Sequence, residues 1–432
     1  MVLHENLDIN EKGHLTIGGA DSVDLASKYG TALMVIDENR VRRNCKIYET
    51  AMREYFGEGS MALYASKALC FKEMYRIAAS EGIGADIVSP GELYTAASAG
   101  FPMEKAFFHG NNKTDADIAL ALDKSIGYFI VDNREELVEL NRQAGERGIV
   151  QKILLRATPG IDPHTHAKIN TGKVDSKFGT AIETGQLTQL VEFTLTLKNI
   201  SLEGFHCHIG SQIFDIDPFC DAADIMLDYI NECRSRFGLE TKILNLGGGF
   251  GVRYTENDPI IDYEENIRGI SEHIKAKCAL YGLTMPKILL EPGRSLVADA
   301  GVTLYTVGSV KHITGYKSYV SIDGGMTDNP RYTLYGSEYT FLIANKAKNE
   351  RDLTCTIAGR CCESGDLLGE NVTLQTPVRG DILAVLVTGA YNYAMASNYN
   401  RVARPAIVLV KDGEDRLAVK RESLEHLASL DI

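Results

Sequence analysis

The chain has 432 residues, of which 44% are hydrophobic and 24% charged, and its formal net charge is −13. This length exceeds the size at which a single hydrophobic core usually stops growing, so we expect two domains. The acidic balance excludes a broad surface for nucleic acid or for anionic membranes, because such surfaces need an excess of lysine and arginine. Any anion that the protein binds must therefore be held by a local site.

The sequence shows no sign of secretion or membrane insertion. The first residues, MVLHENLDINEKGHL, have neither the basic start nor the apolar stretch of a signal peptide, and no apolar run approaches about 18 residues. The nine cysteines form no CxxC pair and no zinc-ribbon spacing, which is typical of reduced and mostly buried thiols. These features predict a cytoplasmic protein.

Strand-like and helical patterns alternate through the first two thirds of the chain. Residues 32–56 read as a strand followed by a helix, with Asp37 or Asn39 as a suitable N-cap. Eight short apolar runs follow, at 61–66, 85–89, 106–110, 127–132, 152–157, 202–210, 242–249 and 287–293. Amphipathic helical patterns separate them, for example at 70–82, 91–100, 134–148, 185–199, 219–238 and 263–282. Eight such units predict a closed (β/α)8 barrel of the TIM type, and a doubly wound open sheet is the alternative.

One interval of this pattern is too long for a simple connection. Residues 157–181, between the fifth and sixth runs, are polar and rich in turn residues. Long ordered loops usually carry function, so we expect this one at the mouth of the barrel. His164 and His166 within it are predicted to be polar loop residues rather than metal ligands.

After residue 297 the pattern changes to strands without intervening helices. Seven strand-like runs lie at 303–313, 319–325, 339–347, 353–359, 371–378, 381–390 and 404–413. Close strands joined by Gly, Asp and Asn turns predict a mostly antiparallel β-sandwich or barrel. We expect residues 1–35 to add a strand to it. The predicted domains are thus a barrel at 36–297 and a β-domain formed by 1–35 and 298–432.

Polar residues gather where the barrel strands are expected to end, which is where barrels of this type place their active sites. Lys67 follows the first strand, Asp86 lies on the second, and His208 follows the sixth. The glycines of GGGFG (247–251) follow the seventh strand, and Glu291 and Arg294 follow the eighth. Scattered surface charges would not fall preferentially at one rim, although a lone lysine is usually only a solvated residue.

The glycine run at 247–251 is predicted to bind a phosphate. Glycines after a strand allow backbone N–H groups to turn toward an anion. Val252 stands where a dinucleotide-binding GxGxxG motif would need glycine or alanine, which argues against a nucleotide fold. A tight turn without any ligand is the alternative for the glycines alone.

A strand-end lysine and a phosphate site together fit pyridoxal 5'-phosphate. The cofactor's aldehyde forms a Schiff base with a lysine, and a carboxylate that faces the pyridine nitrogen keeps this nitrogen protonated. Lys67 and Glu291 are the candidates for these two roles, and His208 can stack on the ring. The competing reading is a metal-dependent hydrolase barrel that uses His206 and His208 as an HxH ligand pair. We rank it far lower, because it leaves the glycine run unused and the eighth strand offers no lone metal-activating aspartate.

Eight motifs, in this order along nearly the whole chain, carry a family resemblance. They are YASKA (64–68), SKFG (176–179), HCHIGSQ (206–212), GGGFG (247–251), EPGRS (291–295), DGGMTDNPRYTLYG (323–336), CESGD (362–366) and GAYNYAMASNYN (389–400). Together they resemble the diaminopimelate decarboxylases, which belong to the fold-type III pyridoxal phosphate enzymes. The resemblance implies a (β/α)8 barrel with a β-domain and the conversion of meso-2,6-diaminopimelate to L-lysine and CO2, the last step of lysine biosynthesis.

The resemblance also assigns residues to roles. It makes Lys67 the Schiff-base lysine and His208 the residue that stacks on the cofactor, with Asp86 nearby and Glu291 at the pyridine nitrogen. The neighbourhood of the phosphate and the substrate is formed by Ser211, Gly248, Gly249, Gly293 and Arg294. The β-domain residues that surround the substrate are Arg331, Tyr335, Glu363 and Tyr391. Cys362 is the implied proton donor, which the family brings from the partner subunit of a homodimer with shared sites.

The implied substrate agrees with these side chains. The end of meso-diaminopimelate that does not react carries a carboxylate and an ammonium group. Arg294 and Arg331 can bind the carboxylate and Glu363 the ammonium, whereas an ornithine site would need no arginine pair. Two positions depart from the family pattern. Arg360 and Cys361 precede Cys362 where the family usually has Gly-Pro-x-Cys, and Tyr332 replaces a frequent proline. Related decarboxylases of D-lysine, D-ornithine or carboxynorspermidine are the alternative.

Overall fold

The computed structural model describes residues 4–161 and 176–432, so His164 and His166 lie outside the described residues. The chain forms two compact units. One comprises Cys45–Gly251 and Ile261–Gly293, and the other comprises Met1–Asn44, Val252–Ile260 and Arg294–Ile432. We call them the barrel unit and the β-unit.

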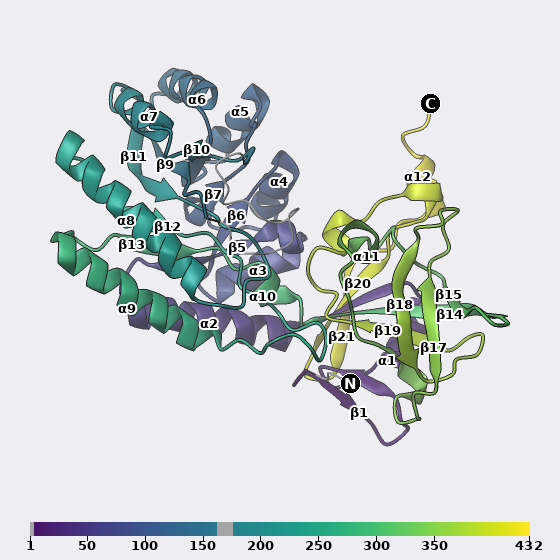
Figure 1. Cartoon of the computed structure of the whole chain (residues 1–432). Coiled ribbons are helices and arrows are strands. Elements are labelled where there is room, and N and C mark those ends of the chain that lie inside the picture. The colour runs from purple at the N-terminus through teal and green to yellow at the C-terminus, as the bar shows by residue number, and fades with distance from the viewer. Residues whose placement is uncertain (1–3, 162–175) are drawn as a thin grey trace. The chain divides into compact units, whose positions relative to one another are not determined.

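The barrel unit contains a closed barrel of eight parallel strands (Figure 1). In barrel order the strands are β5 (Met61–Ala65), β6 (Gly84–Ile87), β7 (Ala106–Phe108), β8 (Tyr128–Val131), β9 (Gln151–Thr158), β11 (Ile200–His206), β12 (Ile243–Asn245) and β13 (Lys287–Leu290). The pairing of β13 with β5 closes the ring, and the two-residue strand β10 (Thr180–Ala181) is added beside β9. The predicted (β/α)8 barrel is confirmed, and the doubly wound alternative is wrong.

Apolar side chains from six of these strands fill the barrel interior. They are Leu63, Phe107, Ile130, Leu154, Ile243 and Leu289. Phe107 stacks on the ring of Tyr128 with their centroids 4.4 Å apart. Because parallel barrel strands are buried on both faces, they read in the sequence as continuous apolar runs rather than as alternating ones. This is why the eight runs were visible without structural information.

Helices connect the strands and surround them in Figure 1. They are α3 (Lys72–Ser80), α4 (Pro90–Ser98), α5 (Asp115–Asp123), α6 (Arg134–Glu146), α7 (Gln186–Thr194), α8 (Asp217–Phe237) and α9 (Tyr263–Tyr281). Helices α8 and α9 end at Gly238 and Gly282, whose φ angles of 65° and 58° are left-handed, as the terminal glycines predicted. Helix α2 (Glu38–Phe56) is capped by Asp37, since its carboxylate accepts hydrogen bonds from the backbone N–H of Asn39 and Arg40.

A buried ion pair joins two segments of the barrel unit. Lys113 Nζ lies 2.8 Å from Glu136 Oε1, and the two side chains are only 1% and 2% exposed. The ammonium also donates to the carbonyl groups of Gly110 and Ile130, at 2.9 Å and 2.8 Å. All three ammonium protons therefore have an acceptor, which is the condition under which a buried charge is tolerated.

Glu136→Leu is expected to destabilise the protein by about 3 to 5 kcal/mol, because it leaves the Lys113 charge buried without its carboxylate. The double change Lys113→Met with Glu136→Leu removes both charges and should cost clearly less. Urea unfolding followed by circular dichroism measures both values. Equal losses for the single and double variants would contradict this account.

The β-unit is built on a nine-stranded sheet. In chain order its strands are β4 (Leu33–Asp37), β14 (Gly301–Ile313), β15 (Lys317–Ile322), β16 (Phe341–Ile343), β17 (Leu353–Ala358), β18 (Leu367–Leu374), β19 (Ile382–Leu386), β20 (Ala406–Lys411) and β21 (Glu414–Val419). The long strand β14 pairs with β4, β15 and β19, so the sheet branches there. The pairings are antiparallel except those of β15 with β17 and of β20 with β4. The predicted mostly antiparallel β-domain is thus present.

The N-terminal residues form a separate small sheet and also contribute to a strand of the large sheet. Strands β1 (Leu7–Ile9), β2 (Leu15–Ile17) and β3 (Ala20–Asp21) form a small sheet of their own, followed by α1 (Ser22–Tyr29). Strand β4 is the part that joins the large sheet, and the predicted boundary between residues 35 and 36 falls within it. The unit also contains the short helices α10 (Arg294–Val297), α11 (Arg331–Tyr335) and α12 (Leu424–Ala428). The predicted limits of the two domains stay a prediction.

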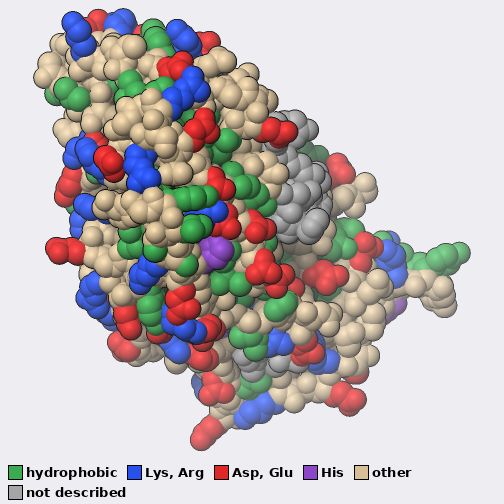
Figure 2. Space-filling view, turned by 60° about the vertical axis from the view of Figure 1, so that its left-hand side comes forward, with side chains coloured by type: hydrophobic (Ala, Val, Ile, Leu, Met, Phe, Trp, Pro, Cys, Tyr) green, Lys and Arg blue, Asp and Glu red, His purple; other side chains and the backbone are tan. Residues whose placement is uncertain are grey.

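The surface shows charges of both signs. On the face drawn in Figure 2, lysine and arginine side chains are scattered among acidic ones rather than gathered in one patch. Within the described part of the chain, no helix combines the length and the apolar character needed to cross a membrane.

Candidate active site

The ends of the barrel strands bring the predicted polar residues together. Lys67 lies in the short turn Ser66–Ala68 after β5, Asp86 lies on β6, and Glu291 follows β13 directly. Lys67 Nζ forms an ion pair with Asp86 Oδ2, and the Asp86 side chain is fully buried. The Lys67 side chain remains 39% exposed, so its amine is held by a buried carboxylate and is still reachable by a ligand.

Glu291 is the centre of a buried polar cluster. Its Oε1 accepts a hydrogen bond of 2.7 Å from Asn245 Nδ2, and its Oε2 accepts one of 3.3 Å from His206 Nε2. His109 Nε2, at the end of β7, lies 3.0 Å from Oε1 and 3.6 Å from Asp86 Oδ1. Burial alone would raise the pKa of the Glu291 carboxyl, but His109 and His206 outweigh it and hold the pKa well below its usual range. The carboxylate is therefore ionised.

The imidazole of His208 is buried and neutral. Burial, together with the nearby charges of Lys67 and Arg156, lowers the pKa of His208 to about 3. Its Nδ1 accepts a hydrogen bond of 3.2 Å from the backbone N–H of Gly248. His206, two residues earlier, faces Glu291 instead. The two histidines of the HxH pattern thus have different partners, unlike a pair of metal ligands.

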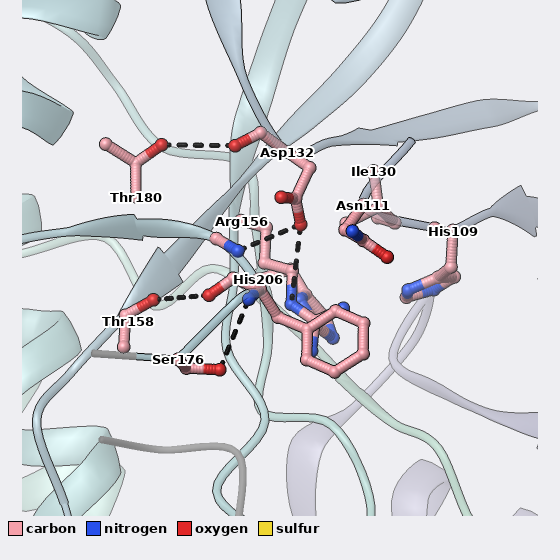
Figure 3. A network of polar contacts seen from close by, with 12 residues as sticks. His109, Asn111, Ile130, Asp132, Arg156, Thr158, Ser176, Thr180 and His206 are labelled. Carbon is pink, nitrogen blue, oxygen red and sulfur yellow. Dashed lines mark hydrogen bonds and ion pairs between the residues drawn. The ribbon is translucent and has the colours of Figure 1, made fainter. Parts of the chain in front are cut away.

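A second charged pair lies on the neighbouring strands β8 and β9. Arg156 is buried on β9, and its Nε lies 4.0 Å from Oδ1 of Asp132, which follows β8. Figure 3 shows this pair together with His109 and His206, all borne on the barrel strands or at their ends. Asp132 Oδ1 also accepts from the backbone N–H of Gly179 at 2.9 Å, and the Asp132 carbonyl accepts from Thr180 Oγ1 at 3.2 Å. The SKFG segment (176–179) is thereby fixed to the barrel rim.

The two segments predicted to surround a phosphate lie side by side. Ile213 N donates to Gly249 O at 3.0 Å, and Gly251 N donates to Ile213 O at 2.8 Å, so residues 208–213 run along residues 247–251. Ser211 lies in the first segment. Gly247 and Gly249 have φ angles of 70° and 127°, and a Cβ atom on Gly248 would lie 2.0 Å from the carbonyl oxygen of Glu291. Glycine is therefore required here by close backbone packing, whatever the segment binds.

These residues fit pyridoxal phosphate. Two buried polar atoms, Asp86 Oδ1 and His206 Nδ1, lack a hydrogen-bond partner among the described residues, as expected where a polar ligand belongs. Lys67 and Glu291 follow β5 and β13, which are neighbouring strands of the barrel. Pyridoxal phosphate requires an amine for its aldehyde and an ionised carboxylate for its pyridine nitrogen, and these two residues provide them. Gly293 packs closely against the segment that carries Lys67, because a Cβ there would lie 3.0 Å from the Cβ of Ala65 and 3.3 Å from that of Ala68.

The same cluster has the composition of a metal site. The ligand atoms of His109, His206 and Glu291 lie within 4.8 Å of one another. Two imidazoles and a carboxylate suit a transition metal. However, a metal at this place would leave the adjacent Lys67 and the arginines described next without a role.

Four of the predicted substrate residues lie together in the β-unit, with two buried guanidinium groups beside two half-buried tyrosines, and these residues are Arg294, Arg331, Tyr335 and Tyr391. Arg294, on α10, is 4% exposed and donates from Nη1 to the Tyr254 hydroxyl at 2.7 Å. Its Cζ lies 4.9 Å from the centroid of the Tyr391 ring. Arg331, on α11, is 7% exposed and has its Cζ 5.9 Å from the same ring and 5.5 Å from that of Tyr335. The two cations therefore share one enclosure.

Arg331 has no counter-charge within the described ranges. No carboxylate of residues 4–161 and 176–432 forms an ion pair with it, and its Nε has no hydrogen-bond partner there. Leaving a cation buried in this way is costly unless an anion arrives from outside. Tyr391 beside it has a left-handed φ of 60°, which is unusual for a tyrosine and typical of functional sites. The cluster therefore contains a buried positive charge that no described carboxylate balances.

Cys362 and Glu363 lie on an exposed loop that is held firmly by its backbone. Asp366 closes the loop, since its carboxylate accepts from the N–H of Cys361 at 2.7 Å and of Met326 at 2.6 Å. Cys362 N donates to Asn400 Oδ1 at 2.7 Å. The Cys362 side chain is exposed, whereas burial and Asp366 raise the pKa of the Cys361 thiol to about 11. Of the two neighbouring cysteines, Cys362 is the one presented outward.

The two departures from the family pattern are accommodated locally. Arg360 donates from its backbone N–H to Gly324 O at 3.0 Å and from its guanidinium to Asp323 O at 3.4 Å. The Tyr332 hydroxyl donates to Glu370 Oε2 at 3.1 Å. Neither contact involves a predicted site residue.

Sequence reasoning missed four residues of these clusters. His109 and Arg156 are polar residues at the ends of apolar runs, the same signal that identified Lys67, and Asn245 interrupts the apolar run before the glycines. Reading every strand end in the same way would have found them. Tyr254 lies in an irregular segment after the glycine run, where nothing in the sequence marks it.

Comparisons with known proteins agree with this geometry. Residues 38–298 match the model of the pyridoxal-binding domain of pyridoxal-dependent decarboxylases. The chain is 47% identical to the diaminopimelate decarboxylase of Bacillus subtilis over 432 residues, which covers 100% of this chain and 98% of the relative.

Solved structures give the same result over the whole length. The diaminopimelate decarboxylase of M. jannaschii in complex with L-lysine superposes with a TM-score of 0.91 at 36% identity, covering 99% of this chain and 98% of the other. The Helicobacter pylori enzyme with L-lysine gives a TM-score of 0.86 at 28% identity, covering 95% and 99%. With a (β/α)8 barrel and a β-unit that carry these clusters, the chain belongs to the diaminopimelate decarboxylase family of pyridoxal-dependent decarboxylases.

Proposed function

We propose that this protein uses pyridoxal 5'-phosphate to decarboxylate meso-2,6-diaminopimelate to L-lysine and CO2, the last step of lysine biosynthesis. The observation that carries the proposal is the buried pair Arg294 and Arg331 on the same chain as the Lys67 and Glu291 cluster. Arg294 follows Glu291 by three residues, so their Cα atoms lie within about 11 Å of each other by chain geometry alone. We propose that one substrate contacts both groups.

The barrel residues would hold the cofactor. Lys67 Nζ would bind its aldehyde carbon, Glu291 would accept a hydrogen bond from its protonated ring nitrogen, and His208 would lie against the ring. Residues 208–213 and 247–251, with Gly293, surround the phosphate. When bound, the cofactor accepts the electron pair that CO2 leaves behind.

The β-unit residues would select the substrate. Arg294 and Arg331 bind the carboxylate at the end that does not react, and planar guanidinium groups suit this because they form two parallel hydrogen bonds. Glu363 binds the ammonium at the same end, and Tyr335 and Tyr391 enclose its carbon chain. A substrate without the distal carboxylate, such as ornithine, would leave the guanidinium groups buried and unpaired.

A second copy of the chain completes the site in this proposal. Cys362 and Glu363 are exposed on a firmly held loop, and we infer that they reach the barrel of the other protomer in a homodimer. The Cys362 thiol then supplies the proton to the carbon that has lost CO2. No disulfide bond joins the nine cysteines, all of which lie in the described part of the chain, and this supports a reducing compartment and thus a cytoplasmic location.

One assay tests the activity directly. CO2 and lysine are measured from meso-diaminopimelate beside ornithine, arginine and D-lysine, with the cofactor-loaded protein. We expect turnover of meso-diaminopimelate only. If D-lysine or ornithine were the preferred substrate, the protein would be a related decarboxylase instead. A colourless preparation that contains metal would support a metal-dependent hydrolase.

Arg331→Leu is expected to lower kcat/KM for meso-diaminopimelate roughly 100-fold, because about 3 kcal/mol of interaction with a desolvated carboxylate is lost. The kcat/KM of Arg331→Lys should lie between those of the wild type and of Arg331→Leu, because lysine keeps the positive charge but cannot form two parallel hydrogen bonds. The matched control is Arg379→Leu, an exposed arginine of the β-unit that donates to Gly308 O. Similar losses in the variant and the control would contradict the assignment.

A further inference from the structure

Two histidines flank the Glu291 carboxylate, and they come from different parts of the barrel. His109 follows β7, His206 ends β11, and Asn245 ends β12, while Glu291 itself follows β13. The two imidazole rings meet edge to face, with centroids 4.9 Å apart and planes at 78°. All four side chains are buried. The arrangement fixes the carboxylate from three sides.

The contacts are distributed unequally over the two carboxylate oxygens. Asn245 Nδ2 at 2.7 Å and His109 Nε2 at 3.0 Å both approach Oε1. His206 Nε2 at 3.3 Å is the protein donor that approaches Oε2 within the described residues. A carboxylate oxygen has two acceptor positions. Oε1 is therefore occupied, and Oε2 keeps one position for a further N–H donor.

A buried carboxylate without such donors would not stay charged. Removing an isolated carboxylate from water costs so much that the group takes up a proton instead. A protonated Glu291 could not stabilise the positive charge of a protonated ring nitrogen, as an ionised carboxylate does when it accepts a hydrogen bond from it. The nearby Asp86 carries the same charge as Glu291, but its charge is offset by Lys67. The donors on Glu291 thus decide whether it can perform its proposed role.

The tautomer of His206 follows from its surroundings. Burial lowers the pKa of His206 to about 4, so the imidazole is neutral and carries one N–H. Its Nδ1 has no hydrogen-bond partner in the described part of the chain, whereas its Nε2 faces Glu291. The proton therefore belongs on Nε2. His109 Nε2 lies 3.0 Å from Glu291 Oε1 and 3.6 Å from Asp86 Oδ1, so this geometry places a proton on it as well.

We propose that His109 and His206 are positioning residues that hold Glu291 ionised and turn its Oε2 toward the ring nitrogen of the cofactor. The inference rests on the proposed function, because it needs the pyridine ring in this site. The histidines act through Glu291 and contact neither the substrate nor its reacting carbon. In this arrangement they determine how completely the ring nitrogen is protonated, and through it the capacity of the cofactor to accept electrons.

The first test reads the ring nitrogen itself. The wild type and the variants His109→Leu, His206→Leu and the double variant are loaded with pyridoxal phosphate labelled with 15N in the ring. The 15N chemical shift then distinguishes a protonated from an unprotonated nitrogen. We expect a protonated value in the wild type, a shift toward the unprotonated value in each single variant, and the largest shift in the double variant. Cofactor dissociation constants should rise about tenfold for each lost donor.

Two sets of variants serve as controls. His109→Gln and His206→Gln place an amide N–H near the position of Nε2, so they should restore most of the protonated signal. His273→Leu makes the same substitution at a half-exposed histidine of α9 that pairs with Asp224, and it should leave the signal unchanged. If the cluster had only a structural role, the glutamine variants would not return the 15N shift of the ring nitrogen toward its protonated value.

The second test needs no substitution and so does not depend on the folding of the variants. The wild-type protein loaded with cofactor is labelled with 15N-histidine, and the imidazole signals that change when the cofactor is removed are assigned. We expect Nε2 of both His109 and His206 to carry a proton. An unprotonated Nε2 at either residue would overturn the inference.

Different results would refute the role of the two histidines and the proposed function. A wild type that takes up the cofactor and decarboxylates meso-diaminopimelate, but whose ring nitrogen shift is unaffected in the leucine variants, refutes the role of the histidines alone. A wild type that binds no pyridoxal phosphate refutes the proposed function.

Discussion

Lys67→Ala is expected to give a protein that no longer holds the cofactor covalently and whose kcat/KM for meso-diaminopimelate is lower by about 1,000-fold or more. Lys67 Nζ is the amine that lies at a barrel strand end beside the buried carboxylate of Asp86, and 39% of its side chain is exposed. Its ion pair fixes the amine in one place, so another lysine cannot substitute for it without moving the barrel.

Absorbance and mass spectrometry measure this effect. The wild type should be yellow after loading, and reduction with borohydride should add the mass of the cofactor to the peptide that contains Lys67. The variant should be colourless after gel filtration and gain no mass. Lys72→Ala, at an exposed lysine of α3 five residues later, is the matched control and should behave as the wild type. Covalent cofactor in the Lys67 variant would contradict the assignment.

Two inactive variants are expected to restore activity when they form one dimer. The proposed homodimer shares its sites, with Lys67 from one protomer and Cys362 from the other. A mixed dimer of Lys67→Ala and Cys362→Ala then contains one site with both defects and one with none. Purified through two different affinity tags, it should show about half of the wild-type activity, while either parent variant shows little.

A second mixed dimer provides the control for complementation. Lys67→Ala combined with Asp86→Ala places one defect in each barrel, so neither site is intact and no activity should be regained. Equal activity of the two mixed dimers would contradict shared sites. Sedimentation of the wild type as a fully active monomer would refute the dimer altogether.

Most of the fold could be predicted because the barrel strands are buried on both faces. Continuous apolar runs such as 61–66 and 287–293 then stand out from the amphipathic helices between them, and their ends mark the rim. The β-unit was predictable in kind, because its strands are short and separated by turn residues. The pairing of its strands could not be predicted. Strand β14 pairs with three others, one of them β4 from residues 33–37, and no local pattern signals these partners.

Some residues of the candidate site could also be predicted from the sequence, and others could not. Lys67, Asp86 and Glu291 follow from their positions at strand ends, whereas Tyr254 became visible only through its hydrogen bond with Arg294. The small sheet in which β1 to β3 pair among themselves was also not signalled by the sequence pattern. Short strands can pair with several partners at little local cost, so only the tertiary structure decides which pairing forms.

The sequence by itself determined the fold class and the identity of the reacting groups, because hydrophobic periodicity and the residue types at strand ends are local properties. The tertiary structure decided the charge state of those groups. Whether Glu291 is ionised depends on His109 and His206, which lie 182 and 85 positions earlier in the chain and meet it only when the barrel closes. Burial and hydrogen bonding set a pKa, and both arise from residues that folding brings together.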